Sequence, residues 1–393
     1  MQEEAIGNNI IMNEKHLDDL VSYLKFPSVS TDSHYKENVR DCAEWLSSKI
    51  DEVGLEASIH ETPGHPIVIG KNKHSEDKPT VMIYGHYDVQ PADPIDLWDS
   101  PPFEPLIKDG KIYARGSTDN KGQHLAHLLG LGETLNENGD LPVNIIYLVE
   151  GEEEIGSPNL EPFLIENKED LDCDVIAVSD TGMIGPGMGT FTYGLRGVAC
   201  MEVKVIGPSK DLHSGVFGGA VANPCTAISK MISSLHDLDG RIKVDGFYDR
   251  VKEIEGWEKT AWAKIQLNEN ETLDLTGAPE LFGETGFSDN ERRWSRPTAE
   301  VNGIGGGYQG EGSKTVIASE SFVKLSFRLV PDQDPDEILN LVRNHFEQCK
   351  PKGVRIEYEM GHSGKAYLMD PQSGYGLAAQ NALRNTFDSD PAL

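Results

Sequence analysis

Long apolar runs and an excess of positive charge are both missing from this sequence. No stretch approaches the ~20 apolar residues that a membrane span needs, and the N-terminal residues MQEEAIGNNI lack the apolar core of a secretory signal. Lysine and arginine number 35 against 65 aspartates and glutamates, which gives a net charge of -30. Because such a surface repels phosphate backbones, we expect neither a membrane nor a nucleic acid as a partner.

Cysteine is scarce, and its spacing suggests no pairing. The number of cysteines is odd, and no two of them lie close enough in the sequence to form a metal-binding knuckle. We therefore expect free thiols, a reducing compartment and a cytoplasmic location. The five positions are Cys42, Cys173, Cys200, Cys225 and Cys349.

The first half of the chain alternates short apolar runs with segments of helical periodicity. Residues 80–84 (TVMIY), 143–149 (VNIIYLV) and 175–178 (VIAV) are typical of buried strands. Strands that alternate with helices favour βαβ units and a mostly parallel sheet, in which sites form at the carboxyl ends of the strands. The helical segments are 14–26, 38–53 and 121–135.

The pattern changes near residue 189. Residues 199–206 (ACMEVKVI) and 321–329 (SFVKLSFRL) alternate apolar and polar side chains, as strands with one face in water do. A helical pattern over 223–238 lies between them. The glycine-rich segment 303–312 lacks the Lys-Ser/Thr ending of a P-loop, so we interpret it as a flexible or substrate-approaching loop, with a plain turn as the alternative.

These patterns predict an α/β protein with an inserted α+β domain. We expect the insert, with an antiparallel sheet, to cover residues 190–365. Residues 1–189 and 366–393 then form the other domain, to which a helix over 375–387 returns.

The motif YGHYDVQP places two polar side chains directly after a predicted strand. His86 and Asp88 are two residues apart, so both side chains point to one face. A histidine that ligates a metal needs an acceptor for its second ring nitrogen, and Asp88 is placed to provide one. The alternative is a chance pairing of the two residues in a loop.

Two aspartates occupy comparable positions further along the chain. Asp119, in ARGSTDNKGQ, precedes a predicted helix, where a carboxylate can bridge two cations or cap the helix. Asp180, in AVSDTG, follows the apolar strand 175–178. Each placement alone means little, but both lie at the ends of elements, as His86 does.

The motif VEGEEEIGS brings several carboxylates to the end of one buried strand. Glu150, Glu152, Glu153 and Glu154 crowd there at an electrostatic cost that bound cations would offset, although a solvated acidic turn is the alternative. Adjacent Glu153 and Glu154 are suited to divide the roles of base and ligand. Imidazole and oxygen ligands without cysteine indicate a hard or borderline metal pair.

Taken together, these four motifs resemble the dinuclear metallopeptidases that include carnosinase, carboxypeptidase G and succinyl-diaminopimelate desuccinylase. The resemblance runs from about Leu20 to Phe387, and DLHSGVFGG is similar to the lid motif of the cytosolic nonspecific dipeptidase and carnosinase branch. It implies a zinc-exopeptidase-like α/β catalytic domain with a mostly parallel mixed sheet, interrupted by an α+β lid that dimerises. Further matching segments are WDSPPFEPLIKDGKIYARG, KTVI, FRLVPDQDP and GHSGK.

The resemblance also implies the metal centre. Each subunit is expected to take two divalent ions, zinc or manganese, with Asp119 bridging them, Asp88 orienting His86, and Glu153 as the general base. The second ion also requires a histidine from a later C-terminal motif. No such motif occurs before Leu393, so we expect either that the given sequence is a fragment of a longer protein or that its second metal site is open. The implied metal ligands are His86, Asp119, Glu154 and Asp180.

In the lid, the resemblance implies a set of substrate-binding residues and a homodimer. His213 is expected to reach the active site of the partner subunit, and Arg328 and His362 to bind the terminal carboxylate of the substrate. The substrate-binding residues implied are His213, Arg328, His362 and Asn302.

These inferences predict a metal-dependent dipeptidase that acts on small peptides. One alternative is a deacylase of N-acyl amino acids, like acetylornithine deacetylase or succinyl-diaminopimelate desuccinylase. The other two are a truncated, inactive dimeric relative and a plain acidic metal-binding protein. The pairing of Glu153 with Glu154 argues against the last, because metal storage needs no spare base.

Overall fold

The chain divides into two compact units in the computed structural model, which describes residues 13–265 and 269–393. Unit 1 ends at Gly182 and unit 2 begins at Met183. Residues 1–10, which we expect not to form a secretory signal, lie outside the described residues. None of the described helices combines the length and the apolar character needed to cross a membrane.

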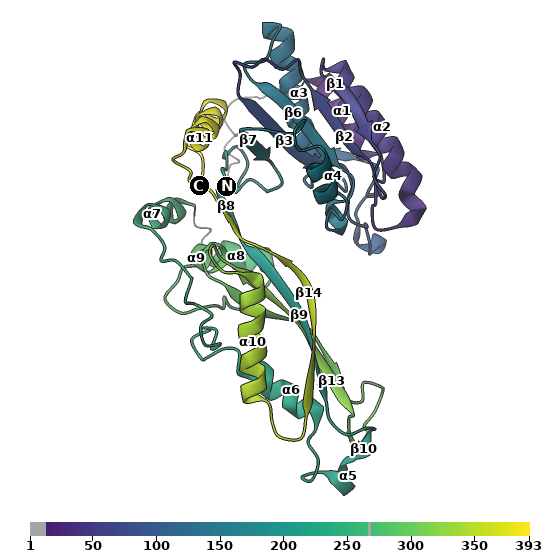
Figure 1. The fold of residues 1–393 in the computed structure, drawn as a ribbon, viewed down its shortest axis with the longest axis vertical. Helices are drawn as coiled ribbons and strands as arrows, with labels where there is room; N and C mark the ends of the chain where they lie inside the picture. The colour runs from purple at the N-terminus through teal and green to yellow at the C-terminus, as the bar shows by residue number, and fades with distance from the viewer. Residues whose placement is uncertain (1–12, 266–268) are drawn as a thin grey trace. The chain divides into compact units, whose positions relative to one another are not determined.

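Unit 1 is built on a five-stranded mixed sheet in the order β1-β2-β6-β3-β7 (Figure 1). As predicted, β3 (Thr80–His86) runs parallel to both β6 (Asn144–Glu150) and β7 (Val175–Val178). The antiparallel hairpin of β1 (Glu56–His60) and β2 (Ile67–Lys71) extends the other edge. The carboxyl ends of β3, β6 and β7 therefore lie side by side at the same end of the sheet.

Helices cover both faces of this sheet. On one face α1 (Glu14–Leu24), α2 (Lys36–Glu52) and α3 (Lys121–Asn138) enclose a core with the inward side chains of the strands. On the other face α4 (Leu160–Glu166) packs through Phe163. The helical spacing of apolar residues explains why α2 folds against the sheet. Its buried apolar residues are Val39, Cys42, Ala43, Leu46 and Ile50.

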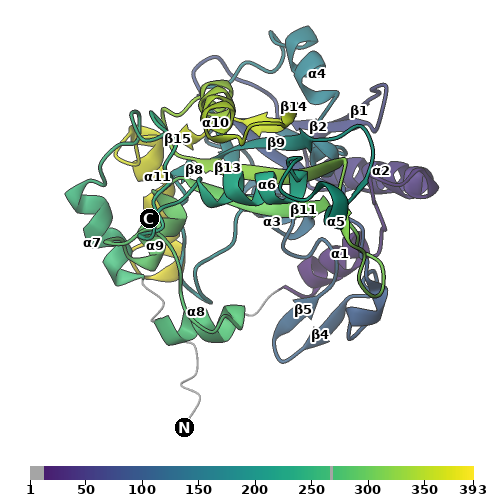
Figure 2. The same ribbon diagram turned by 90° about the horizontal axis from the view of Figure 1, so that it is seen from below.

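Short elements complete unit 1. The strands β4 (Leu106–Lys108) and β5 (Lys111–Tyr113) form a separate hairpin (Figure 2). Single 3₁₀ turns are η1 (Ser33–Tyr35), η2 (Ile95–Leu97) and η3 (Glu153–Ile155). Of these, η3 matters most, because it follows β6 directly and carries two of the predicted site residues.

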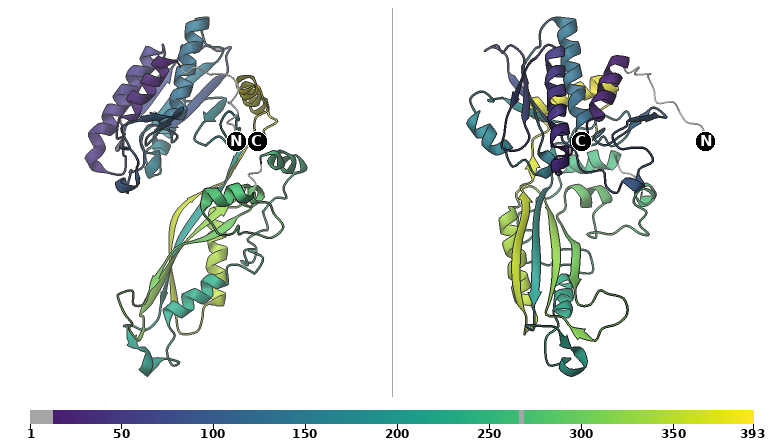
Figure 3. Two further views of the ribbon diagram at one scale, coloured as in Figure 1. Left: turned by 180° about the vertical axis from the view of Figure 1, so that it is seen from behind. Right: turned by 90° about the vertical axis from the view of Figure 1, so that its right-hand side faces the viewer.

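Unit 2 is an antiparallel sheet covered by helices, as predicted for the lid. Its four strands lie side by side in the order β11-β13-β9-β14 (Figure 3). Helices α6 (Pro224–Ser233) and α10 (Pro335–Cys349) pack on the buried face of the sheet. Burial alternates along β9 and β13, whose more exposed side chains therefore lie on the opposite face. The strand bounds are β9 (Gly197–Ile206), β11 (Thr298–Gly306), β13 (Glu320–Leu329) and β14 (Arg355–Gly364).

The remaining elements of unit 2 are short strand pairs and helices. They are β8 (Gly194–Leu195) with β15 (Tyr367–Leu368), β10 (Leu212–His213) with β12 (Val316–Ile317), α5 (Ser214–Phe217), α7 (Gly256–Lys264), α8 (Glu269–Thr276), α9 (Asp289–Trp294) and α11 (Gly374–Phe387). The assignment of residues 366–393 to the catalytic domain stays a prediction.

The glycine-rich segment differs from its expected form. Residues 303–306 are not loop but complete strand β11, and only the remainder forms turns. The reason is a close approach across the sheet, because a Cβ on Gly305 would lie 2.5 Å from the Phe322 ring. Glycine is therefore needed here to let β11 pair beside a bulky side chain.

Candidate metal centre

His86 ends β3 with its imidazole fully buried and its two nitrogens in different surroundings. Nδ1 lies 3.0 Å from the backbone carbonyl of Asp88. Because a carbonyl only accepts, Nδ1 carries the proton of the neutral ring, and the lone pair belongs to Nε2. Nε2 is buried and lacks a hydrogen-bond partner among the described residues. A histidine that binds a metal needs this arrangement, in which one ring nitrogen donates to a fixed acceptor and the other keeps a free lone pair.

Carboxylates surround this unpaired nitrogen. Nε2 lies 3.1 Å from Asp119 Oδ1, 3.7 Å from Asp180 Oδ2 and 4.0 Å from Glu153 Oε2. Burial alone would lower the pKa of His86, but the facing carboxylates of Asp119, Asp180 and Asp88 raise it to about 12. A field this negative favours a cation, and a divalent ion would take the place of the proton.

The donor set fits a metal ion in two overlapping groups. His86, Asp119 and Asp180 place ligand atoms within 4.8 Å of one another, and so do His86, Glu153 and Glu154. One imidazole with several carboxylate oxygens suits zinc or manganese. The structure thus brings together every predicted metal ligand and the predicted base within unit 1.

The Asp88 carboxylate accepts hydrogen bonds from several segments around the candidate metal centre. Its buried carboxylate accepts hydrogen bonds from Ser30 Oγ at 2.6 Å and from the backbone amides of Glu153 and Glu154 at 3.2 and 3.1 Å. The carboxylate oxygen Oδ1 lies 3.4 Å from His86 Nδ1, whereas the backbone carbonyl oxygen of Asp88 lies 3.0 Å from it. Asp88 therefore fixes His86 and the η3 turn relative to each other.

Glu153 and Glu154 share one turn but differ in their partners. Glu154 Oε2 accepts a hydrogen bond from Gln90 Nε2 at 2.9 Å, whereas the Glu153 carboxylate has no such donor in the described part of the chain. Burial raises the pKa of Glu153 to about 7, helped by Asp180, Glu154 and Asp88 and opposed by His86. A carboxylate with a pKa near neutrality is suited to proton transfer.

The other two glutamates of the same motif have structural partners. Buried Glu150 accepts from Tyr84 Oη at 2.6 Å and from Ser157 Oγ at 2.8 Å. Glu152 accepts from the backbone amide of His65 at 3.0 Å and from Asn159 at 2.7 Å. Their carboxylates are satisfied by hydrogen bonds, which the sequence pattern did not distinguish from the ligand role.

Sequence reasoning missed one residue of this centre. Asn120 is 1% exposed and contacts two of the ligand-bearing segments through its side chain. Its position next to Asp119 was the only signal available, since a local pattern does not show where an amide points. Asp119 itself is not the helix cap, because Asn120 occupies the N-cap position of α3.

The four predicted lid residues all lie in unit 2. Arg328, Asn302 and His362 belong to the same antiparallel sheet, on β13, β11 and β14. Asn302 falls where the pairing of β11 shifts register, and His362 falls at the corresponding shift in β14. His213 ends β10, where Nδ1 accepts from the Gly215 amide at 3.0 Å.

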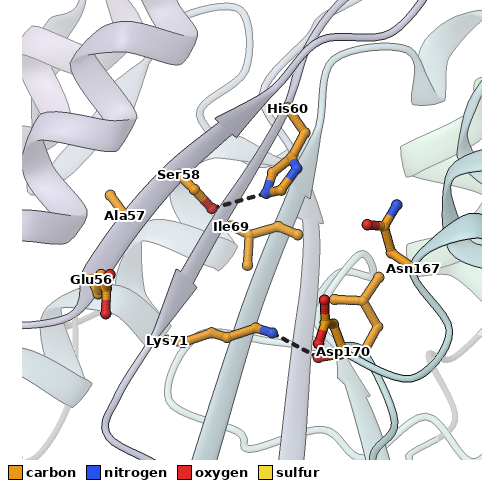
Figure 4. A pocket seen from close by; sticks show the side chains of 9 residues that line it. Glu56, Ala57, Ser58, His60, Ile69, Lys71, Asn167 and Asp170 are labelled. Carbon is orange, nitrogen blue, oxygen red and sulfur yellow. Dashed lines mark hydrogen bonds between the residues drawn. The ribbon is translucent and has the colours of Figure 1, made fainter.

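A separate surface pocket is lined by β1, β2 and the segment that follows α4. Figure 4 shows that Ser58 and His60 point toward each other there, joined by a 2.9 Å hydrogen bond, while Lys71 donates to the Asp170 carbonyl at 2.6 Å. Because these polar groups already pair with one another or with backbone, the pocket offers no ligand set like that around His86.

Comparison with known proteins adds the family context. The sequence pattern described as peptidase family M20/M25/M40 matches residues 82–392. The Cys-Gly metallodipeptidase DUG1 of Saccharomyces cerevisiae is 30% identical over 95% of this chain and 82% of its own length.

Two solved structures have the same fold. The M20 family metallo-carboxypeptidase Sso-CP2 from Sulfolobus solfataricus superimposes with a TM-score of 0.83 at 34% identity, covering 97% of this chain and 85% of that one. Human carnosine dipeptidase 1 gives a TM-score of 0.80 at 28% identity, with 97% and 84% covered.

Proposed function

The chain belongs to peptidase family M20/M25/M40, and from this membership we propose that it is a metal-dependent dipeptidase. The observation that carries the proposal is the buried, unpaired Nε2 of His86 facing carboxylates, with Glu153 beside it. The Cys-Gly and β-Ala-His dipeptidases among its relatives support a dipeptide as the substrate.

We propose that unit 1 binds one divalent ion, zinc or manganese, and supplies part of the site for a second. His86, Asp119 and Asp180 would hold one. Asp119 and Glu154, whose charges act on each other, would contribute to the other. Bound there, the ions would lower the pKa of a shared water and polarise the carbonyl of the scissile bond.

Glu153 supplies the proton transfers in this proposal. Its carboxylate takes a proton from the attacking water and later delivers it to the leaving amine, so that the base is regenerated. The position of Glu153 in η3 supports the role. Its backbone amide is tied to Asp88, which leaves the side chain at the edge of the ligand cluster.

Arg328 and His362 are proposed to bind the terminal carboxylate of the substrate. Neither side chain has a hydrogen bond or ion pair within the described residues. Burial lowers the pKa of nearby Arg196, and the charges of Arg328 and Arg293 lower it further. The charge of Glu300 acts in the opposite sense but more weakly, so the guanidinium groups of Arg196 and Arg328 together favour an anion. Asn302 is proposed to contribute at the same sheet, since bulges often redirect side chains next to active sites.

His213 is proposed to stabilise the oxyanion in a homodimer, in the site of the partner subunit. Because its Nδ1 accepts from the Gly215 amide, the ring proton of the neutral imidazole lies on Nε2. Nε2 is then the donor, and it now lies 3.3 Å from Thr315 Oγ1. This is the tautomer that donates to a developing negative charge.

We also propose that the protein acts in a reducing, cytoplasmic compartment, which its five free cysteines support. Small peptides are the proposed partners, and the acidic charge supports neither nucleic acid nor an anionic membrane surface as one.

The test is hydrolysis by the purified chain of Cys-Gly, β-Ala-His and a panel of N-acyl amino acids. Each assay is run with added zinc or manganese and with a chelator. Cleavage of dipeptides that the chelator abolishes is the expected result. Cleavage restricted to N-acyl amino acids would instead identify a deacylase, and chelator-resistant cleavage would contradict a metal mechanism.

A further inference from the structure

Asn120 sits among the metal ligands as a buried amide that serves no ligand role itself. It occupies the N-cap position of α3, yet its side chain makes no capping hydrogen bond. An asparagine at this position ordinarily accepts from the first turn of the helix. Because a buried amide must still be paired, its partners lie elsewhere.

Those partners are the segments that carry two other ligands. Asn120 Oδ1 accepts the backbone N–H of His86 at 3.2 Å. Its Nδ2 donates to the Ser179 carbonyl at 3.0 Å and to Asp180 Oδ1 at 3.0 Å. The side-chain amide of Asn120, the residue after Asp119, therefore bonds both the end of β3 and the residues just after β7.

The bond to Asp180 also decides which carboxylate oxygen remains available. With Oδ1 engaged by Asn120, the other oxygen, Oδ2, lies 3.7 Å from His86 Nε2. The hydrogen bond to Asn120 thus holds Asp180 with its other oxygen directed at the ligand cluster.

A glycine makes this contact sterically feasible. A Cβ on Gly85 would lie 2.8 Å from Asn120 Oδ1 and 2.6 Å from His124 Cβ. The glycine before His86 in YGHYDVQP therefore lets α3 approach β3 closely enough for the amide to reach the backbone N–H. A side chain there would push Asn120 away from the ligands.

We propose that Asn120 is a positioning residue that sets the affinity of the metal centre by orienting Asp180 and the end of β3. This inference rests on the metal site of the proposed function. Outer partners of metal ligands typically contribute 10–100-fold to metal affinity, because they fix the ligands before the ion arrives.

If Asn120 had only a structural role, its replacement would lower stability without a specific loss of metal affinity. Asn144 provides the matched control. Asn144 is also buried, and its amide bonds the Ser75 and Lys78 carbonyls at 2.9 and 3.0 Å. It begins β6, at the opposite end of that strand from Glu150. Replacing it removes comparable hydrogen bonds away from the metal ligands.

The experiment is calorimetric titration of the chelator-treated full chain with Mn²⁺ alone, together with urea unfolding of each variant. Asn120→Ala is expected to raise the Kd for Mn²⁺ by about 10–100-fold. Asn144→Ala is expected to lower the urea midpoint while keeping the parental Kd. If Asn120→Ala does not fold, Asn120→Ser replaces it in the same comparison.

Two results would overturn the inference. One is a parental Kd in a folded Asn120 variant, and the other is an equal loss of affinity in Asn144→Ala. If the parent chain binds no Mn²⁺, the proposed metal site itself is wrong. That result contradicts the proposed function, whereas the two results above contradict only the positioning role of Asn120.

Discussion

The neighbouring glutamates of VEGEEEIGS have different surroundings because their hydrogen-bond partners differ. Glu150 and Glu152 are buried and accept two hydrogen bonds each, so they brace the loops around the site. Glu153 keeps a partly buried carboxylate whose pKa is raised to about 7, chiefly by burial. At the scale of residues, hydrogen-bond partners rather than residue type distinguish the structural acids Glu150 and Glu152 from the proposed base Glu153.

Glu153→Gln should retain the metal and lose turnover. The amide preserves shape and burial but cannot accept the proton of the water, so kcat is expected to fall by about 10²–10⁴. Metal content by elemental analysis and dipeptide hydrolysis are measured on the same sample. Glu152→Gln is the control and should lose thermal stability more than kcat. If Glu153→Gln turns over dipeptides at the parental rate, Glu153 is not the general base.

His124 gives the stability of unit 1 a dependence on pH. The imidazole is 1% exposed, with Tyr23 Oη 3.0 Å from Nε2 and the Tyr147 hydroxyl at Nδ1. Burial lowers the pKa of His124 well below its usual value of 6.5. In the unfolded chain it takes up a proton below about pH 6.5, whereas in the folded chain it stays neutral. Its contribution is therefore complete above pH 6.5 and is lost as the pH falls below that value.

Comparison with His124→Gln should reveal this contribution. The free energy of unfolding in urea is measured at pH 8 and pH 5.5 for both chains. The parent is expected to lose more stability on acidification than the variant, because only the parent carries the buried imidazole. Equal losses would show that His124 does not contribute to the acid sensitivity.

At the scale of elements, the sequence predicted the strands of the site better than the contacts between them. The apolar runs before His86, Glu150 and Asp180 predicted β3, β6 and β7, and the polar residues just after them marked the edge where the site lies. The β1–β2 hairpin escaped prediction, because its addition to β6 depends on pairing with a distant strand. The bond from Asn120 to Asp180 spans 60 residues and depends on one side-chain orientation.

A buried ion-pair network in unit 2 joins Glu284, in the segment between α8 and α9, to Arg296, just after α9. Glu284 and Arg296 are each 8% exposed and form two parallel hydrogen bonds, at 2.7 and 2.8 Å. Arg241 adds a third contact at 3.1 Å. A neutral side chain at position 284 would leave two guanidinium groups facing each other without a carboxylate.

Glu284→Gln should therefore destabilise unit 2 by about 3–5 kcal/mol, the usual cost of removing one partner of a buried pair. Urea unfolding followed by circular dichroism measures the loss. Glu320→Gln is the control, because its ion pair with Lys204 is exposed and should contribute nothing measurable. Similar losses in the two variants would mean that the network around Glu284 is not held as the geometry indicates.

At the scale of the whole molecule, the proposed catalysis draws on residues from both units. The proposed metal ligands and the proposed base Glu153 belong to unit 1, whereas His213 and Arg328 belong to unit 2. A net charge of -30 on each chain opposes the association of two copies. Salt screens that repulsion, so a homodimer of this chain should be favoured by moderate ionic strength.

Mixing two inactive variants tests whether His213 acts across that dimer. In a hybrid of His213→Ala with Glu153→Gln, one site combines an intact metal centre with an intact lid histidine from the other chain. Random equal mixing makes half of the dimers hybrid, with one of two sites restored, so about a quarter of parental activity should return. The measurement is dipeptide hydrolysis after subunit exchange, with each variant alone as the control. If His213 serves its own chain, the mixture stays as inactive as its components, because no subunit then carries both groups.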